Sequence, residues 1–178
     1  MDELIAEVLR LDDRRQAVFR VALAEQVQPI LASSKHYQYA VRARDLCWRW
    51  IVHGDVNGDT FLALWWNDDD FGVGPAMDVA FGHDHDTSMG NAWGCVAGAL
   101  TYIGYCAFQA DDLPIPQDFN YDDYPDEILS ENLGYYHGVV GSSGVPELLV
   151  EWLRDLSHDQ LTQSVVDAKL DDLASPLE

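Results

Sequence analysis

The hydrophobic pattern of the chain is dominated by the stretch Asn91 to Ala110, which has twenty residues and no charged side chain. Large apolar residues such as Trp93, Leu100 and Phe108 recur at intervals of three and four positions, and small residues fill the places between them. This spacing predicts an α-helix that is apolar on nearly every side. Such a helix must be covered by other helices all around.

A stretch of this length also suits a membrane-spanning helix, and Gly94 and Gly98 have the spacing found between packed membrane helices. Two observations favour a buried core helix instead. No Lys or Arg flanks the stretch, and Asp111 and Asp112 follow it directly. Its glycines and alanines are then expected to let neighbouring helices approach closely.

Similar periodicities predict helices along most of the remaining chain. The expected helices span residues 2–11, 13–32, 36–53, 61–66, 76–81, 91–110, 125 to 134 or 138, 146–156 and 157–170. The fold class predicted is therefore mainly α, a single domain over residues 1–178 with seven to nine helices around the central helix at about 91–110. A possible strand is expected only near residues 138–145.

Several residues are expected to shape the helix ends. Asp12 or Asp13 can cap the second helix, and Pro29 should kink or tighten its last turn. Gly54 is expected to end the third helix. The helix that opens at Pro125 should stop at Gly134 or Gly138, and Ser157 with Gln160 should form a capping box for the last helix.

Side-chain positions on these helices can be predicted in the same way. Ile30 and Leu31 fall on the buried side of the second helix. Trp48 and Trp66 lie off the apolar sides of their helices, so either indole could reach the surface. The other tryptophans fit a hydrophobic core.

Composition adds a strong charge signal to this picture. The 178 residues include 31 acidic and only 10 basic side chains, which gives a net charge of −21. The imbalance is local, because residues 50–153 contain no Lys or Arg and eighteen Asp or Glu. Such a surface repels nucleic acid and anionic membranes and attracts basic partners. A surface that only served solubility would be expected to include lysines.

The N-terminal residues are acidic and amphipathic and lack the features of a secretory signal, so a cytoplasmic chain is expected. The three cysteines agree with that compartment. Cys95 and Cys106 lie eleven positions apart on the central helix, about 16 Å along its axis, which is beyond disulfide reach. We expect the cysteines to be small core residues.

Candidate chemistry is sparse. The best metal-binding candidate is the segment His83-Asp84-His85-Asp86, whose alternating imidazoles could share one side of an extended segment. His53, Asp55 or His137 could add ligands only if the fold brought them close. The chain has no nucleophile elbow and no phosphate-binding glycine motif. We therefore expect no enzymatic activity, no cofactor and no resident metal, and keep a metal-dependent hydrolase using His83 and His85 as the alternative.

A set of aromatic and glycine positions resembles a mainly helical family of bacterial immunity proteins from polymorphic toxin systems. The matching residues are Val18 to Ile30, Cys47-Trp48-Arg49-Trp50, Gly58-Asp59-x-Phe61-x-x-Leu64, the acidic run 67–70, Ala92-Trp93, Ala99, Tyr102, Ala107-Phe108 and Leu113-Pro114-x-Pro116. The resemblance covers roughly residues 15–120. It implies a cytoplasmic antidote that binds a cognate toxin domain, possibly a nuclease, and neutralises it.

The resemblance and the charge pattern lead to the same hypothesis. Because nuclease substrate grooves are basic, acidic and aromatic surface residues are the natural contacts for such a toxin. The predicted contacts are Trp66, Asp68, Asp69, Asp70, Asp84, Asp86, Asp111, Asp112, Asp118, Tyr121, Asp122, Asp123, Tyr124 and Asp126. A second alternative is an acidic mimic of nucleic acid that binds a housekeeping DNA-binding protein; in neither case is direct binding of nucleic acid or membrane expected.

Overall fold

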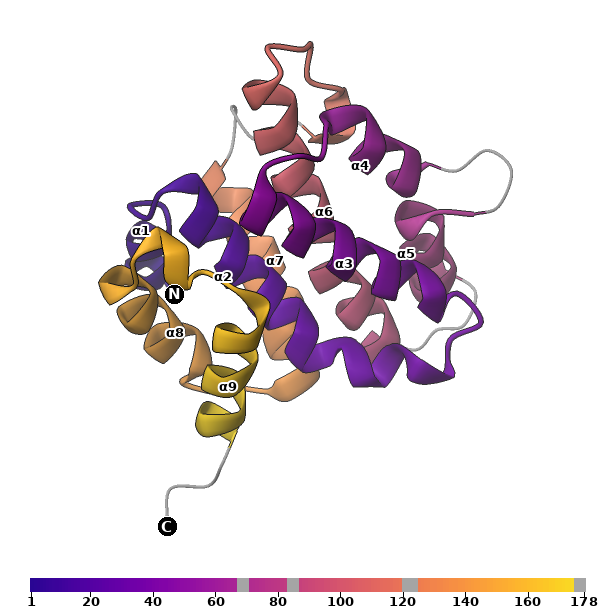
Figure 1. Ribbon diagram of the computed structural model, residues 1–178. Helices are drawn as coiled ribbons and strands as arrows, with labels where there is room; N and C mark the ends of the chain where they lie inside the picture. Colours follow the sequence, from indigo (N-terminus) through magenta and orange to yellow (C-terminus); the bar gives the residue numbers. More distant parts are fainter. Residues whose placement is uncertain (67–70, 83–86, 120–124, 175–178) are drawn as a thin grey trace.

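The computed structural model describes residues 1–66, 71–82, 87–119 and 125–174, and these residues form helices and connecting turns with no β-strand (Figure 1). The α-helices are α1 (Asp2–Val8), α2 (Asp13–Val27), α3 (Tyr37–His53), α4 (Gly58–Trp65), α5 (Val73–Gly82), α6 (Thr87–Ala110), α7 (Pro125–Val140), α8 (Val145–Asp155) and α9 (Gln163–Ala174). Three 3-10 segments, η1 (Gln28–Ser33), η2 (Gln117–Phe119) and η3 (His158–Gln160), join them. The predicted mainly α fold is confirmed, and the strand expected near residues 138–145 is wrong.

Helix α6 is the centre of the fold, as its sequence predicts. It contains the whole uncharged stretch and begins four residues earlier, at Thr87. Helices α2, α3, α4, α5 and α7 all pack against it, so side chains on every side of α6 are buried (Figure 1). None of the described helices combines the length and hydropathy that crossing a membrane requires.

Glycines on α6 allow its neighbours to approach closely. A Cβ atom added at Gly94 would lie 2.4 Å from the ring of Tyr135 on α7. One added at Gly104 would lie 2.1 Å from the ring of Phe119 in η2. Both distances are far shorter than a van der Waals contact. The expected close packing around α6 is therefore confirmed, and it depends on the absence of a side chain at Gly94 and Gly104.

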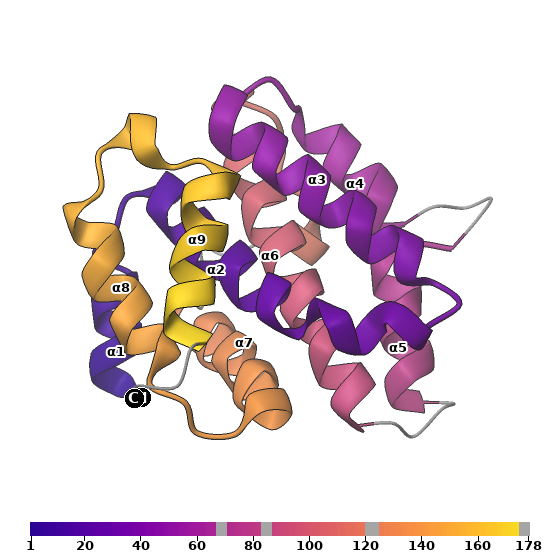
Figure 2. The ribbon, with the colours of Figure 1, turned by 60° about the horizontal axis from the view of Figure 1, so that its bottom comes forward.

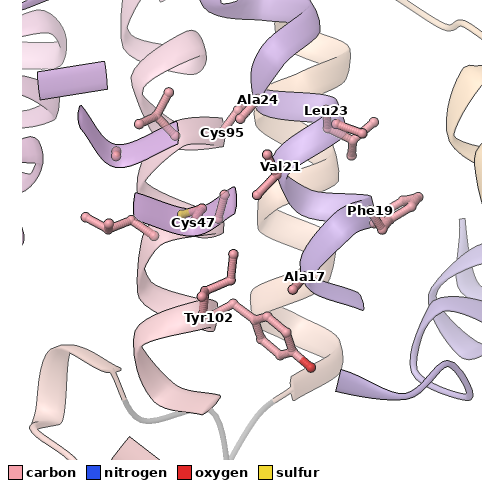
Figure 3. Packing of buried hydrophobic residues seen from close by; sticks show 14 of the residues in the cluster. Ala17, Phe19, Val21, Leu23, Ala24, Cys47, Cys95 and Tyr102 are labelled. Atoms are coloured by element: carbon pink, nitrogen blue, oxygen red, sulfur yellow. The ribbon is translucent and has the colours of Figure 1, made fainter. Parts of the chain in front are cut away.

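Helix α2 lies between α6 and an outer layer made of α1, α8 and α9 (Figure 2). Val21 and Phe19 point to opposite sides of α2, and both are buried (Figure 3). The Arg20 guanidinium is also buried and lies 4.2 Å from the centre of the Tyr102 ring on α6. Because it is covered on two sides, α2 buries polar as well as apolar residues.

The N-terminus of α2 and its final turn follow most of the sequence predictions. The Asp12 side chain accepts a hydrogen bond from the Arg15 backbone N–H (3.0 Å), and Pro29 lies in the tighter 3-10 segment η1. The sequence pattern predicts Ile30 and Leu31 on the buried side, but Ile30 is 37% exposed and only Leu31 is buried. The three-residue turn of a 3-10 helix rotates Ile30 away from the face that α2 presents.

The ends of the other helices are partly as predicted. Gly54 ends α3 with a left-handed φ of 64°. Helix α7 runs through Gly134 and Gly138 and ends before Gly141, whose φ is 75°, so the two predicted stops are wrong. At Gly138 a Cβ atom would lie 2.1 Å from Asn91 on α6, so this glycine serves helix packing.

The capping box at Ser157 and Gln160 is present, but it opens the short segment η3. The Gln160 side chain accepts a hydrogen bond from the Ser157 backbone N–H (3.0 Å). Helix α9 begins later, at Gln163. The predicted motif is therefore correct and its assignment to the last helix is wrong.

All three cysteines are free and buried, as expected of core residues. Cys47 lies on α3 and Cys95 on α6 (Figure 3). Cys106 also lies on α6. Burial raises the pKa of the Cys95 and Cys106 thiols to about 12, so both are protonated at neutral pH.

Candidate partner-binding surface

The described part of the chain includes five of the fourteen predicted contact residues. These are Trp66, Asp111, Asp112, Asp118 and Asp126, and all five are exposed. The other nine, Asp68, Asp69, Asp70, Asp84, Asp86, Tyr121, Asp122, Asp123 and Tyr124, lie outside the described residues. The geometry of the candidate surface is therefore built from the first five and their neighbours.

Trp66 and Asp118 are joined directly, although 52 positions separate them in the sequence. The Trp66 indole N–H donates a hydrogen bond to Asp118 Oδ2 (2.8 Å). The Trp66 ring is 49% exposed and meets the ring of Trp65 edge to face, with centroids 6.3 Å apart. The indole is thus held from two sides while half of its surface faces solvent.

The position of Asp118 depends on its buried neighbour Phe119. The Phe119 ring lies between α6 and α4, beside Gly104, and meets the Trp65 ring edge to face at 6.2 Å. Its backbone N–H donates to Pro116 O (2.9 Å), which closes the turn. Because Phe119 is fully buried, the preceding Asp118 is fixed at the surface next to Trp66.

Asp111 and Asp112 lie at the other end of α4, where α6 stops. The Asp111 side chain accepts a hydrogen bond from the backbone N–H of Gly58 (3.3 Å), the first residue of α4. A carboxylate is favourable at this helix N-terminus. Asp112 takes a left-handed φ of 54° and turns the chain away from α6. We call the exposed residues Trp66, Asp111, Asp112 and Asp118 the α4 rim.

The negative charge near the α4 rim is only partly compensated. Arg49 donates two hydrogen bonds to Asp55 (3.0 and 2.8 Å), and these bonds lower the pKa of the Asp55 carboxyl. Among the described residues, no Lys or Arg forms an ion pair with a member of the α4 rim. The rim therefore carries net negative charge at both ends of α4, with Asp118 beside the exposed Trp66 ring.

Asp126 is not part of the α4 rim. It belongs to the first turn of α7 and lines a groove between α7 and α1. Figures 1 and 2 both show α1 well apart from α4. The structure thus brings four of the five described contact residues to the two ends of one helix and places the fifth elsewhere.

A buried carboxyl on α2 is a polar centre that the sequence did not reveal. The Glu25 side chain accepts hydrogen bonds from the Trp48 indole N–H on α3 (2.8 Å) and from Gln163 on α9 (3.3 Å). Burial raises its pKa to about 7, against the lowering effect of the Trp48 bond. Trp48 itself is buried, so the expectation that it could reach the surface is wrong, whereas Trp66 does reach it.

The metal alternative gains no support from the described residues. No group of three or more His, Cys, Asp and Glu side chains in residues 1–66, 71–82, 87–119 and 125–174 is arranged to hold a metal ion. His137 Nδ1 lies 3.0 Å from the Gly141 carbonyl oxygen at the end of α7. The segment His83 to Asp86 lies outside the described residues.

Comparison with protein-family models identifies a family for this chain. The family model described as Immunity protein Imm6 matches residues 15–133, about two thirds of the chain. Searches of curated proteins and of solved structures found no match. The matched residues run from α2 into α7 and contain α6, Asp126 and the whole α4 rim. The chain therefore belongs to the Imm6 family of immunity proteins.

Proposed function

We propose that this chain neutralises a basic toxin domain by binding it through the α4 rim, without catalysis of its own. Membership of an immunity protein family supports a toxin-neutralising role. In the proposed interface, Trp66 is the aromatic anchor, and Asp111, Asp112 and Asp118 are the anionic contacts. The complex would form in the cytoplasm of the cell that makes both proteins.

The bond between Trp66 and Asp118 is the observation that carries this proposal. Tryptophan is among the residues that contribute most to binding at protein interfaces, and an anchor fixed before binding loses little entropy. Here the indole is held by a carboxylate from a distant segment and by the edge of Trp65, while half of its surface stays exposed.

The charge of the chain supports a basic partner. With a net charge of −21, the protein attracts cationic surfaces and repels nucleic acid. A toxin that acts on nucleic acid must present a positive surface to its substrate. We therefore favour a nuclease as the toxin, with the α4 rim facing its basic surface.

The test begins with retrieval of the toxin from the native strain on the immobilised chain. The retrieved protein must be toxic when expressed alone, and an equimolar amount of this chain must abolish that toxicity. Trp66→Ala is then expected to weaken binding about thirtyfold, the size of effect typical of an interface hot spot. Titration calorimetry or biolayer interferometry measures the dissociation constant.

Leu148 on α8 provides a matched control, because its side chain has the same 49% exposure as Trp66. Leu148→Ala should leave toxin binding unchanged. The triple variant Asp111→Asn, Asp112→Asn, Asp118→Asn should slow association and reduce its dependence on salt. Wild-type affinity in both the Trp66 and the triple variant would rule out the α4 rim as the toxin contact.

A further inference from the structure

We propose that the groove between α1 and α7, here called the acidic groove, is a second contact region and receives a lysine- or arginine-bearing segment of the toxin. This inference rests on the proposed toxin-binding function and extends it to a surface apart from the α4 rim. The groove has a volume of about 630 Å³. That volume is sufficient for one or two long side chains.

The acidic groove combines an apolar lining with carboxylates. Ile5, Ala6 and Leu9 of α1 supply the apolar part, and Ile5 is almost fully buried. Asp2 on α1 and three acidic residues on α7 complete the lining. The α7 carboxylates are those of Asp126, Glu127 and Glu131. In the part of the chain that the structure describes, no basic side chain lines the groove.

These carboxylates are available to a partner. Asp2, Asp126 and Glu127 are exposed and form no ion pair with another described residue. Glu131 Oε1 accepts a hydrogen bond from the Tyr135 hydroxyl (2.6 Å), which holds this carboxylate in place. On α1, Glu7 forms an ion pair with Arg154 of α8 (3.0 Å), but Glu7 does not line the groove.

The lining matches the two halves of a basic side chain. The methylene stems of Lys and Arg pack on apolar surface while their charged heads seek carboxylates. A nucleic acid or an acidic peptide has the wrong charge for this groove. A foreign basic segment is therefore the occupant that charge and apolar lining both favour.

A second copy of this chain is a poorer occupant. The chain has 10 basic against 31 acidic residues, so two copies repel each other. The exposed Arg49 already forms two hydrogen bonds with Asp55, and docking it into another copy would break them. Charge complementarity alone therefore favours a partner richer in basic residues than this chain.

One toxin domain can reach both contact regions. Phe119, beside the α4 rim, and Pro125, beside Asp126, are six positions apart in the sequence. Their Cα atoms can therefore lie at most about 22 Å apart. A folded domain of 100 residues has a radius of gyration of about 13 Å, so its surface spans that distance.

The closing experiment uses a probe that does not depend on the toxin. The probe is a blocked twelve-residue peptide with Lys and Leu spaced three and four positions apart, titrated into the ¹⁵N-labelled full chain. The expected result is a set of amide shifts concentrated in α1 and the first half of α7. The same peptide with Glu in place of Lys should produce none.

The variant that tests the groove is Asp126→Asn with Glu127→Gln, which keeps side-chain size and removes two charges. It should weaken peptide binding about threefold to tenfold, the range expected for the loss of two exposed ion pairs. The matched control is Glu147→Gln with Glu151→Gln on α8, where both residues are also exposed. This control removes the same net charge and should leave peptide binding unchanged.

Three outcomes would overturn the inference. Shifts centred on the α4 rim, or an equal loss of binding in the α8 control, would show that the peptide senses only the overall charge. Self-association that the groove variant abolishes would make a second copy the occupant. None of these results touches toxin neutralisation, which is tested separately by the Trp66 variants, and failure of those variants would leave the peptide result in place.

Discussion

Helices α2 and α6 are both buried on all sides, but they are buried by different means. On α6 the buried aliphatic hydroxyl is that of Thr101. It donates a hydrogen bond within its own helix, to Ala97 O (2.9 Å). On α2 the buried polar groups reach outside the helix. Gln16 donates to Leu11 O (2.9 Å), and Glu25 accepts from α3 and α9.

The difference follows from what covers each helix. Helix α6 is covered mostly by apolar faces of its neighbours, so burial there is chiefly removal of apolar surface from water, with Arg20 over the Tyr102 ring as an exception. Helix α2 has α6 on one side and the layer of α1, α8 and α9 on the other. Polar groups on α2 therefore need partners outside the helix, which Gln16 finds at Leu11 O and Glu25 finds on α3 and α9.

Truncation of the α6 core should produce the largest loss of stability. Trp93 is almost fully buried on α6, and Trp93→Ala is expected to lower the free energy of unfolding by about 3–5 kcal/mol through lost burial and a cavity. Urea denaturation followed by circular dichroism measures this change. Trp66→Ala, at a half-exposed site, should cost much less, and equal losses would show that the core does not centre on α6.

The buried carboxyl of α2 should make stability depend on pH. Because burial raises the Glu25 pKa from 4.5 to about 7, the folded chain keeps a proton that the unfolded chain loses above pH 4.5. This group therefore lowers stability as pH rises from about 4.5 to 7, by about 3 kcal/mol at most, and adds no further change above that range.

Glu25→Gln tests this dependence. The amide oxygen of the variant can still accept the Trp48 bond, so we expect the variant to be more stable than wild type at pH 8 and equal to it near pH 4.5. The other charges near Glu25 are those of Arg44 and Asp167, which act in opposite directions. A stability difference that does not change with pH would show that folding leaves the Glu25 pKa unshifted.

A smaller effect is expected where neighbours approach α6. Gly104→Ala places a methyl group against the Phe119 ring and should lower stability by about 1–2 kcal/mol, the low part of the range for overpacking. Gly134→Ala on α7 is the control, because a Cβ atom there meets nothing within 4 Å. It should raise stability by about 0.5–1 kcal/mol through helix propensity. Thermal unfolding of both variants in parallel separates the two effects.

The comparison of α2 with α6 also explains which parts of the fold the sequence predicts. An all-round apolar helix such as α6 carries its own signal, and so do local helix ends such as Asp12 and Gly54. A glycine in the sequence does not by itself show whether a helix ends there. Gly54 ends a helix, whereas Gly138 stays inside α7 because it touches Asn91 of α6, a contact that no local pattern contains.

The sequence predicts which kinds of residue lie on the candidate surface, but it does not predict how they are arranged. Exposed acidic residues and Trp66 were expected from charge and periodicity. The bond from Trp66 to Asp118 and the bond from Gly58 to Asp111 join residues more than fifty positions apart. Only the packing of Phe119 against α6 brings Asp118 to Trp66, and only the length of α6 brings Asp111 to α4.

The burial of all three thiols makes their chemical reactivity a measure of how often the protein opens. Cys47, Cys95 and Cys106 lie where α3 and α6 meet their neighbours, with their sulfur atoms shielded from solvent. A thiol-modifying dye in the surrounding buffer can attack them only during transient separations of these helices. The rate at which the thiols react with the dye therefore reports the frequency of these openings, and no label has to be engineered into the chain.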